Sequence, residues 1–211
     1  MRTQLTYLFD PLCGWCYGAS PLVQALGQHP GVELSLAPTG LFAGAGRTMD
    51  AAFSAYAWSN DQRIQTLTGQ RFTEAYRQQV LGRLGSAFDS TAATMALTAV
   101  AVTQASAEGE ALKQLQEARY LQGRDTCDPA VVAEVLRDMG QGAAADRLLA
   151  GDVEMQQTHH GRLQQARQLM QSLGAQGVPA LVMDQGSGRR LLRGQLLYGS
   201  LDELLAEAGG A

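Results

Sequence analysis

Hydrophobic and polar positions near the start of the chain predict a strand, a helix and a second strand. Residues 4–9 are rich in aromatic and branched side chains, and the turn signal Asp10-Pro11 ends them. Apolar residues then recur at helical spacing over 16–26, and residues 32–37 alternate again. Two strands joined by such a helix should lie parallel, with a right-handed crossover.

A proline lies inside the predicted helix, at position 21. In a helix interior, proline removes one hydrogen bond and crowds the preceding turn. We therefore expect a kink at Pro21 rather than the end of the helix.

The next part of the chain reads as a helical block. From about residue 49 to residue 160 there is little strand character, and Ala, Leu, Gln, Glu and Arg are frequent between single glycines. Asp128-Pro129 has the pattern of an N-cap followed by proline at the first helical position. A further helix is predicted from about residue 156 to residue 173.

The C-terminal part predicts a hairpin and a last helix. Two apolar runs, 180–183 and 190–193, flank a Gly-containing turn. Ser200 and Glu203 then stand at the spacing of a capping box before the final helix.

These elements together predict an α/β fold. With the helical block removed, the order strand-helix-strand, helix-strand-strand-helix is that of a thioredoxin fold, here with a large all-helical insertion. We expect residues 1–47 and 160–211 to form the thioredoxin-like domain and residues 48–159 to form the helical insertion domain.

A dithiol motif lies between the first strand and the helix, with the sequence Cys13-Gly14-Trp15-Cys16. The start of a helix offers unpaired backbone N–H groups and the positive end of the helix dipole, and both favour a thiolate. Because the thiolate is the nucleophile in disulfide exchange, this placement predicts thiol chemistry.

Composition and charge narrow the classes of function. The chain has 211 residues, 45% of them apolar, which is ample for a buried core. A net charge of −4 without a basic cluster predicts no nucleic-acid partner. We expect no membrane segment, and we expect a cytoplasmic location because the first strand begins almost at once, without room for a signal peptide.

Two other roles for the dithiol are weaker. A structural disulfide closing so short a loop offers only about 2 kcal/mol. A zinc site needs two further ligands, and none stands at zinc-ribbon spacing among Cys127, His29, His159 and His160. We therefore predict no metal and no cofactor.

The third cysteine, two histidines and a glycine-rich segment are predicted to have no catalytic or ligand-binding role. We expect Cys127, just before the predicted N-cap, to be a partly buried thiol without a catalytic role. His159 and His160 should be solvated, since neighbouring helical side chains point in different directions. The glycines over 40–46 lack the spacing of nucleotide-binding loops and predict a flexible connection.

Two segments carry a resemblance to a known family. The sequence DPLCGWCYGASP at residues 10–21, together with GVPAL at residues 177–181, resembles the DsbA-like branch of the thioredoxin superfamily. It is most similar to the cytoplasmic members described as predicted protein-disulfide isomerases or FrnE-like oxidoreductases. The resemblance covers the whole chain, including the helical insertion, which in that family roofs the active site.

The resemblance implies a role for each residue of the motif. Cys13 would be the attacking, more exposed thiol and Cys16 the buried resolving thiol. Pro179 would be a cis-proline facing them, and the Val178 backbone would pair with an extended substrate strand. Gly14 and Trp15, between the cysteines, would belong to the substrate-binding surface.

The implied activity is thiol–disulfide exchange through a mixed disulfide, with polypeptide or glutathione-like thiols and disulfides as partners. Gly14 and Trp15 stand where the family's secreted oxidases usually carry proline and histidine, which removes one source of thiolate stabilisation. The sequence therefore leaves oxidase, reductase and isomerase open, and it indicates no oligomeric state.

Two other function classes are kept as alternatives. The first is a glutathione-dependent isomerase or transferase, similar to 2-hydroxychromene-2-carboxylate isomerase and the kappa-class transferases. Those enzymes use serine at the first position and need no resolving cysteine. The second is a non-catalytic binding module in which the dithiol acts as a redox sensor.

Overall fold

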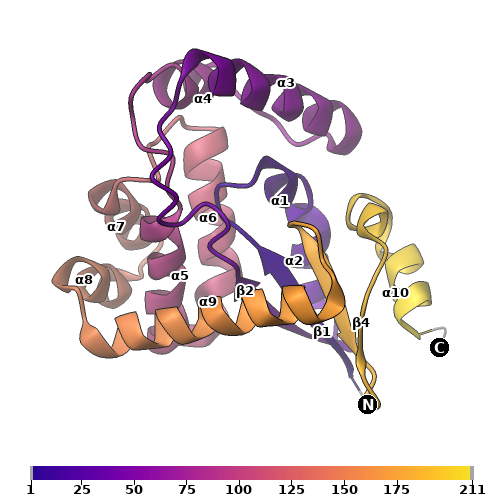
Figure 1. Cartoon of the computed structure of the whole chain (residues 1–211). Coiled ribbons are helices and arrows are strands. Elements are labelled where there is room, and N and C mark those ends of the chain that lie inside the picture. Colours follow the sequence, from indigo (N-terminus) through magenta and orange to yellow (C-terminus); the bar gives the residue numbers. More distant parts are fainter. Residues whose placement is uncertain (1, 210–211) are drawn as a thin grey trace.

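The centre of the protein is a mixed four-stranded sheet, seen in a computed structural model that describes residues 2–209 (Figure 1). The strands follow the order β2-β1-β3-β4. β1 (Thr3–Phe9) pairs parallel with β2 (Val32–Pro38) and antiparallel with β3 (Ala180–Asp184). β4 (Arg189–Leu191) completes the predicted hairpin with β3.

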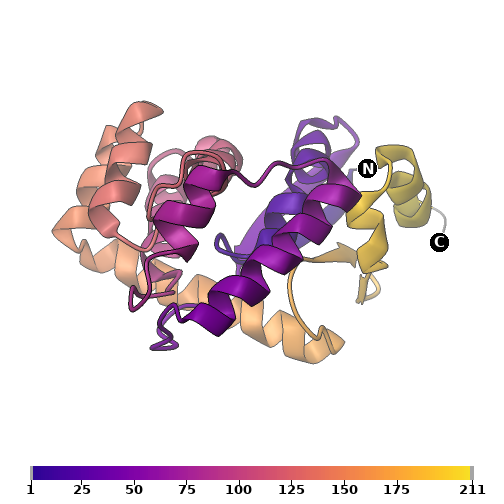
Figure 2. The same cartoon turned by 90° about the horizontal axis from the view of Figure 1, so that it is seen from above.

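Helices cover both faces of this sheet. Successive side chains of β1 point to opposite faces, so they pack against different helices. Leu5 and Tyr7 join the core formed with the helix after β1 and with the last helix of the chain. Leu8 instead packs against Ala166, on the long helix that crosses the other face. Figure 2 shows these helices on opposite sides of the strands.

The helix after the first strand differs from the prediction. It is divided into α1 (Gly14–Gly18) and α2 (Ser20–Gln28), with Ala19 between them. The expected kink at Pro21 is therefore wrong, since the break comes two residues earlier. Pro21 stands in the first turn of α2, where its missing N–H costs no helical hydrogen bond.

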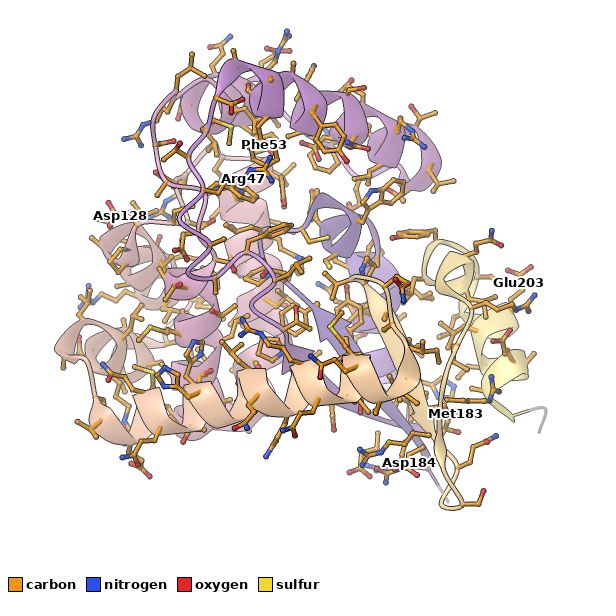
Figure 3. The ribbon with its side chains drawn as sticks, viewed as in Figure 1. Arg47, Phe53, Asp128, Met183, Asp184 and Glu203 are labelled. Carbon is orange, nitrogen blue, oxygen red and sulfur yellow. The ribbon has the colours of Figure 1, made fainter. Side chains whose placement is uncertain are left out.

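The connection from β2 to the insertion is rich in glycine with positive φ. Gly40, Gly44 and Gly46 have φ values of 56°, 67° and 64°, a region that favours glycine. The connection then reaches Arg47, whose guanidinium lies 3.6 Å from the ring centroid of Phe53 (Figure 3). This cation–π contact fastens the end of the connection to the first helix of the insertion.

The insertion is helical, as predicted. The Asp128 side chain accepts a hydrogen bond from the N–H of Ala130, which confirms the expected N-cap. The elements are α3 (Ala51–Thr68), α4 (Glu74–Tyr76), the π-turn η1 (Arg77–Leu81), α5 (Thr91–Gln104), the 3₁₀ turn η2 (Ala105–Ala107), α6 (Glu108–Tyr120), α7 (Pro129–Asp138) and α8 (Gly142–Ala150).

The long helix α9 (Val153–Leu173) runs from the insertion across the sheet (Figure 1). It begins earlier than predicted. His159 faces α5, where it is 4% exposed and its Nδ1 lies 3.3 Å from Thr98 Oγ1. The expectation of a solvated His159 is wrong, because the sequence pattern predicted the helix but not that α5 packs against this side of it. His160 is exposed.

The chain closes with the 3₁₀ turn η3 (Gly194–Tyr198) and α10 (Leu201–Gly209). The Glu203 N–H donates to Ser200 Oγ and the Ser200 N–H donates to Glu203 Oε2, each at 3.2 Å. These bonds confirm the capping box. The order of elements is thus that of a thioredoxin fold with a helical insertion, as the sequence predicted.

Candidate functional site

The dithiol lies at the carboxyl end of β1, where Cys13 is the N-cap of α1. Cys13 has extended backbone angles, and its Sγ accepts a hydrogen bond from the Cys16 N–H at 3.4 Å. Cys13 is 7% exposed and Cys16 is not exposed, and both are free thiols. A sulfur that receives a backbone N–H at a helix start is placed to carry negative charge.

Cys16 is built into the core one turn further along. Burial and the neighbouring Cys13 sulfur hold the pKa of the Cys16 thiol well above its usual range. The Tyr7 hydroxyl donates to the Cys16 carbonyl oxygen at 3.3 Å, and its ring stacks on Phe9. The second sulfur is therefore held as a neutral thiol, out of reach of solvent.

The loop before β3 meets the dithiol from the other half of the chain. The peptide bond between Val178 and Pro179 is cis. The Cys13 thiol donates to the Val178 carbonyl oxygen across 3.6 Å, a normal distance for a sulfur donor. The structure thus brings Cys13, Val178 and Pro179 together, although they are far apart in the sequence.

The two spacer residues differ in their surroundings. Trp15 is half-buried, and its ring packs edge-on against Tyr198 with the centroids 5.5 Å apart. Gly14 faces α3, the insertion helix above α1 (Figure 1), and a Cβ at Gly14 would lie 2.5 Å from Asp61 Oδ1. The insertion therefore reaches the dithiol at Gly14.

Asp10 is a functional-site residue that the sequence interpretation missed. Its side chain is fully buried and accepts hydrogen bonds from Leu12 N (2.9 Å), Phe42 N (3.1 Å) and Ser90 Oγ (2.8 Å). Burial raises the pKa of this carboxyl, against the effect of those hydrogen bonds. Asp10 ties the segment before Cys13 to the insertion, whereas the sequence suggested only a turn signal.

An aromatic cluster supports the site beneath α3 and α4. The Tyr17 ring stacks on Tyr120 with the centroids 4.7 Å apart, and the Tyr120 hydroxyl donates to the Leu12 carbonyl at 2.8 Å. Arg119 is buried beside these rings, with its guanidinium 5.6 to 6.0 Å from the centroids of Tyr76, Phe88 and Tyr120. The insertion thus contacts α1 at Tyr17 and the preceding Leu12 through aromatic residues, beside which a buried cation lies.

A cavity of about 680 Å³ extends along α2 between β2 and α6. Tyr7 and Cys16 contribute to its wall, as does Gln116. Gln116 is 1% exposed, and neither atom of its amide has a hydrogen-bond partner within residues 2–209. Cys16 is therefore one of the residues that border a space with polar groups in its wall.

Cys127 lies on the loop before α7, where it is half-buried against the aromatic cluster. Burial raises the pKa of this thiol. Within the described residues, no group of three or more His, Cys, Asp or Glu side chains could hold a metal ion. No helix in the same part of the chain is both long and apolar enough to cross a membrane.

Comparison with solved structures identifies close relatives of this arrangement. The cytosolic disulfide reductase DsbM from Pseudomonas aeruginosa is 30% identical, over 99% of this chain and 100% of that protein, with a TM-score of 0.86. Its structure with glutathione (GSH) matches at 30% identity, 98% of each chain and a TM-score of 0.85. A protein from Nitrosomonas europaea shares the fold at 22% identity, over 98% of this chain and 99% of its own, with a TM-score of 0.78.

Comparison with family models agrees with these structures. The model described as DSBA-like thioredoxin domain matches residues 4–203. A comparison with curated proteins finds no match. The chain therefore belongs to the DSBA-like thioredoxin domain family, and it is a thiol–disulfide oxidoreductase of that family.

Proposed function

We propose that the protein reduces disulfide substrates, with Cys13 as the attacking thiol and Cys16 as the resolving thiol. The observation that carries this assignment is the difference between the two sulfurs. Cys13 caps α1, keeps slight exposure and faces the Val178 carbonyl, whereas Cys16 is buried with its pKa raised. The slightly exposed Cys13 would attack the substrate disulfide, and the buried Cys16 would then resolve the mixed disulfide, which fits this difference.

The reaction consists of two exchanges. The Cys13 thiolate attacks one sulfur of a substrate RSSR′, so that a Cys13–SR bond forms, the substrate S–S bond breaks and R′S⁻ leaves. Cys16 then loses its proton and attacks the Cys13 sulfur, which forms the Cys13–Cys16 disulfide and releases RS⁻. Two electrons pass to the substrate, and the two protons of the dithiol are balanced by those taken up in RSH and R′SH.

The return step needs two equivalents of a thiol, and we propose a glutathione-like thiol for it. Two such molecules reduce the Cys13–Cys16 disulfide and leave as their own disulfide. Two observations support the reducing direction. The spacer Gly14-Trp15 lacks the histidine of the secreted oxidases, and the 30% identical relative is described as a cytosolic disulfide reductase with a structure that contains GSH.

Substrate backbone would bind beside the disulfide, at Val178 and Pro179, with the Trp15 ring as a neighbouring surface. When Cys13 carries a thiol, its S–H donates to the Val178 oxygen. When Cys13 becomes a thiolate or joins a mixed disulfide, that oxygen is released and can accept an N–H from an extended substrate strand. Ionisation of Cys13 would thus prepare the binding position.

We also propose that residues 1–47 and 160–211 form the catalytic domain and that residues 48–159 roof it. The contacts of Asp10 with Ser90 and of Gly14 with Asp61 support this arrangement. A cytoplasmic location would supply reduced glutathione for the return step.

The test is insulin reduction with glutathione as electron donor, coupled to glutathione reductase. Cys13→Ser should lose at least a hundredfold in rate, because the nucleophile is gone. Cys127→Ser is the matched control and should stay within about twofold, since Cys127 lies on the loop before α7 with its pKa raised by burial. Full activity in Cys13→Ser would overturn the proposal.

A further inference from the structure

The insertion holds a buried carboxyl group against the residue that follows Cys13. Asp61 on α3 is 4% exposed. A Cβ at position 14 would lie 2.5 Å from Asp61 Oδ1 and 3.2 Å from Ile64 Cδ1, and real Cβ atoms essentially never approach an oxygen to 2.5 Å. Gly14 and Asp61 therefore fit together, and glycine at position 14 leaves room for the carboxyl.

The two oxygens of the Asp61 carboxyl have different surroundings. The Tyr76 hydroxyl of α4 donates to Asp61 Oδ2 at 3.0 Å. Within residues 2–209, no hydrogen bond reaches Oδ1, the oxygen that meets Gly14. One oxygen is thus fixed by Tyr76 while the other faces the first turn of the dithiol helix.

The charged and titratable groups around Asp61 come from two elements: Tyr76 lies on α4, and Arg119 and Tyr120 lie on α6. On α1, Asp61 meets Gly14, the residue that follows the N-cap Cys13. Burial raises the pKa of Asp61 to about 7, while the Tyr76 hydrogen bond and the Arg119 charge act in the opposite direction. The carboxyl therefore changes its charge in the pH range of thiol exchange.

We propose that Asp61 controls the charge at the dithiol: its carboxylate, held against Gly14, disfavours the Cys13 thiolate and so favours the disulfide form. A negative charge close to a second developing negative charge opposes its formation. Stabilising the reduced, thiolate form makes a dithiol a strong oxidant, so opposing the thiolate makes it a better reductant. This proposal rests on the proposed roles of Cys13 and Cys16.

The test measures the rate at which iodoacetamide alkylates Cys13, followed by mass spectrometry, from pH 5.5 to pH 8.5 in wild type and Asp61→Asn. The rate ratio of variant to wild type should be close to one at pH 5.5, where Asp61 is neutral. Above pH 7, where only the wild type carries the carboxylate, the ratio should rise to as much as about three- to tenfold at each pH at which Cys13 is still incompletely ionised. Equal rates in the two proteins throughout that range would overturn the proposal.

An equilibrium measurement gives a second readout. At pH 8, the ratio of oxidised to reduced glutathione that half-oxidises Asp61→Asn should be about three- to tenfold higher than that for wild type. An unchanged ratio contradicts the proposal. Alkylation needs no disulfide substrate, so a failure of Cys13 and Cys16 to act in turnover would be recognised separately from a failure of the Asp61 effect.

Two further variants keep the test independent of folding defects. Tyr76→Phe retains the carboxylate but removes a hydrogen bond that lowers the pKa of Asp61, so the pH at which alkylation becomes retarded should move upward. An unchanged profile in Tyr76→Phe would also count against the proposal. The control is Glu74→Gln, which removes an exposed carboxylate from α4 and should leave the alkylation profile as in wild type.

Discussion

The sulfur of Cys13 lies 3.6 Å from the carbonyl oxygen of Val178, a residue 165 positions further along the chain. The contact joins the helix start after β1 to the loop before β3, on either side of the helical insertion. The same loop contains the cis Val178–Pro179 bond. The proposed nucleophile and the proposed backbone acceptor for substrate therefore meet near the carboxyl end of β1.

The first prediction concerns the selectivity of alkylation. In the native reduced protein at pH 7.5, iodoacetamide should label Cys13 at least tenfold faster than Cys16, because Cys16 has no exposure and a raised pKa. Mass spectrometry of tryptic peptides gives both rates. In urea the two rates should become similar, and equal rates in the native protein would contradict the assignment of roles.

The second prediction concerns Asp10. Asp10→Ala should lower the free energy of unfolding by about 2–4 kcal/mol, because it leaves Leu12 N, Phe42 N and Ser90 Oγ without their buried acceptor. Urea denaturation measures this change. Ser90→Ala removes only one of these bonds and should cost about 1 kcal/mol. An Asp10→Ala variant as stable as wild type would show that this carboxyl does not tie the insertion to the dithiol segment.

The third prediction concerns His159 and pH. Burial lowers the pKa of His159 to about 4, below the value of about 6.5 in an unfolded chain. The unfolded state therefore binds the proton first as the pH falls, and the stability from neutral His159 is lost between about pH 6.5 and pH 4. The urea midpoint should fall less from pH 7 to pH 5 in His159→Gln than in wild type. The matched variant His160→Gln, at an exposed position, should keep the wild-type decrease; equal decreases in all three proteins would refute this origin.

Local patterns were sufficient for much of the fold. The strand 4–9, the Asp128 cap, the hairpin and the capping box at Ser200 all depend on residues close together in the sequence, and the structure contains each of them. The dithiol was found in the same way, from its position between a strand and a helix. Such features follow from local hydrogen bonds and periodicity.

The remaining features depend on contacts between distant segments. The burial of His159 is decided by Thr98 on another helix, and the hydrogen bonds of Asp10 come from Phe42 and Ser90. Likewise, the meeting of Gly14 with Asp61 requires α3 to lie over α1. The one signal for it was a glycine at the first spacer position, which indicates a close approach without identifying what approaches.

The most direct test of the central claim is to trap the mixed disulfide in Cys16→Ala. With Cys13 intact and the resolving sulfur removed, the variant should attack a disulfide substrate once and remain joined to it. Mass spectrometry should show one adduct on Cys13, which dithiothreitol releases, while Cys13→Ser should form none. If Cys16→Ala traps nothing and keeps full activity on a substrate without a disulfide, the account is contradicted and a glutathione-dependent isomerase or transferase takes its place.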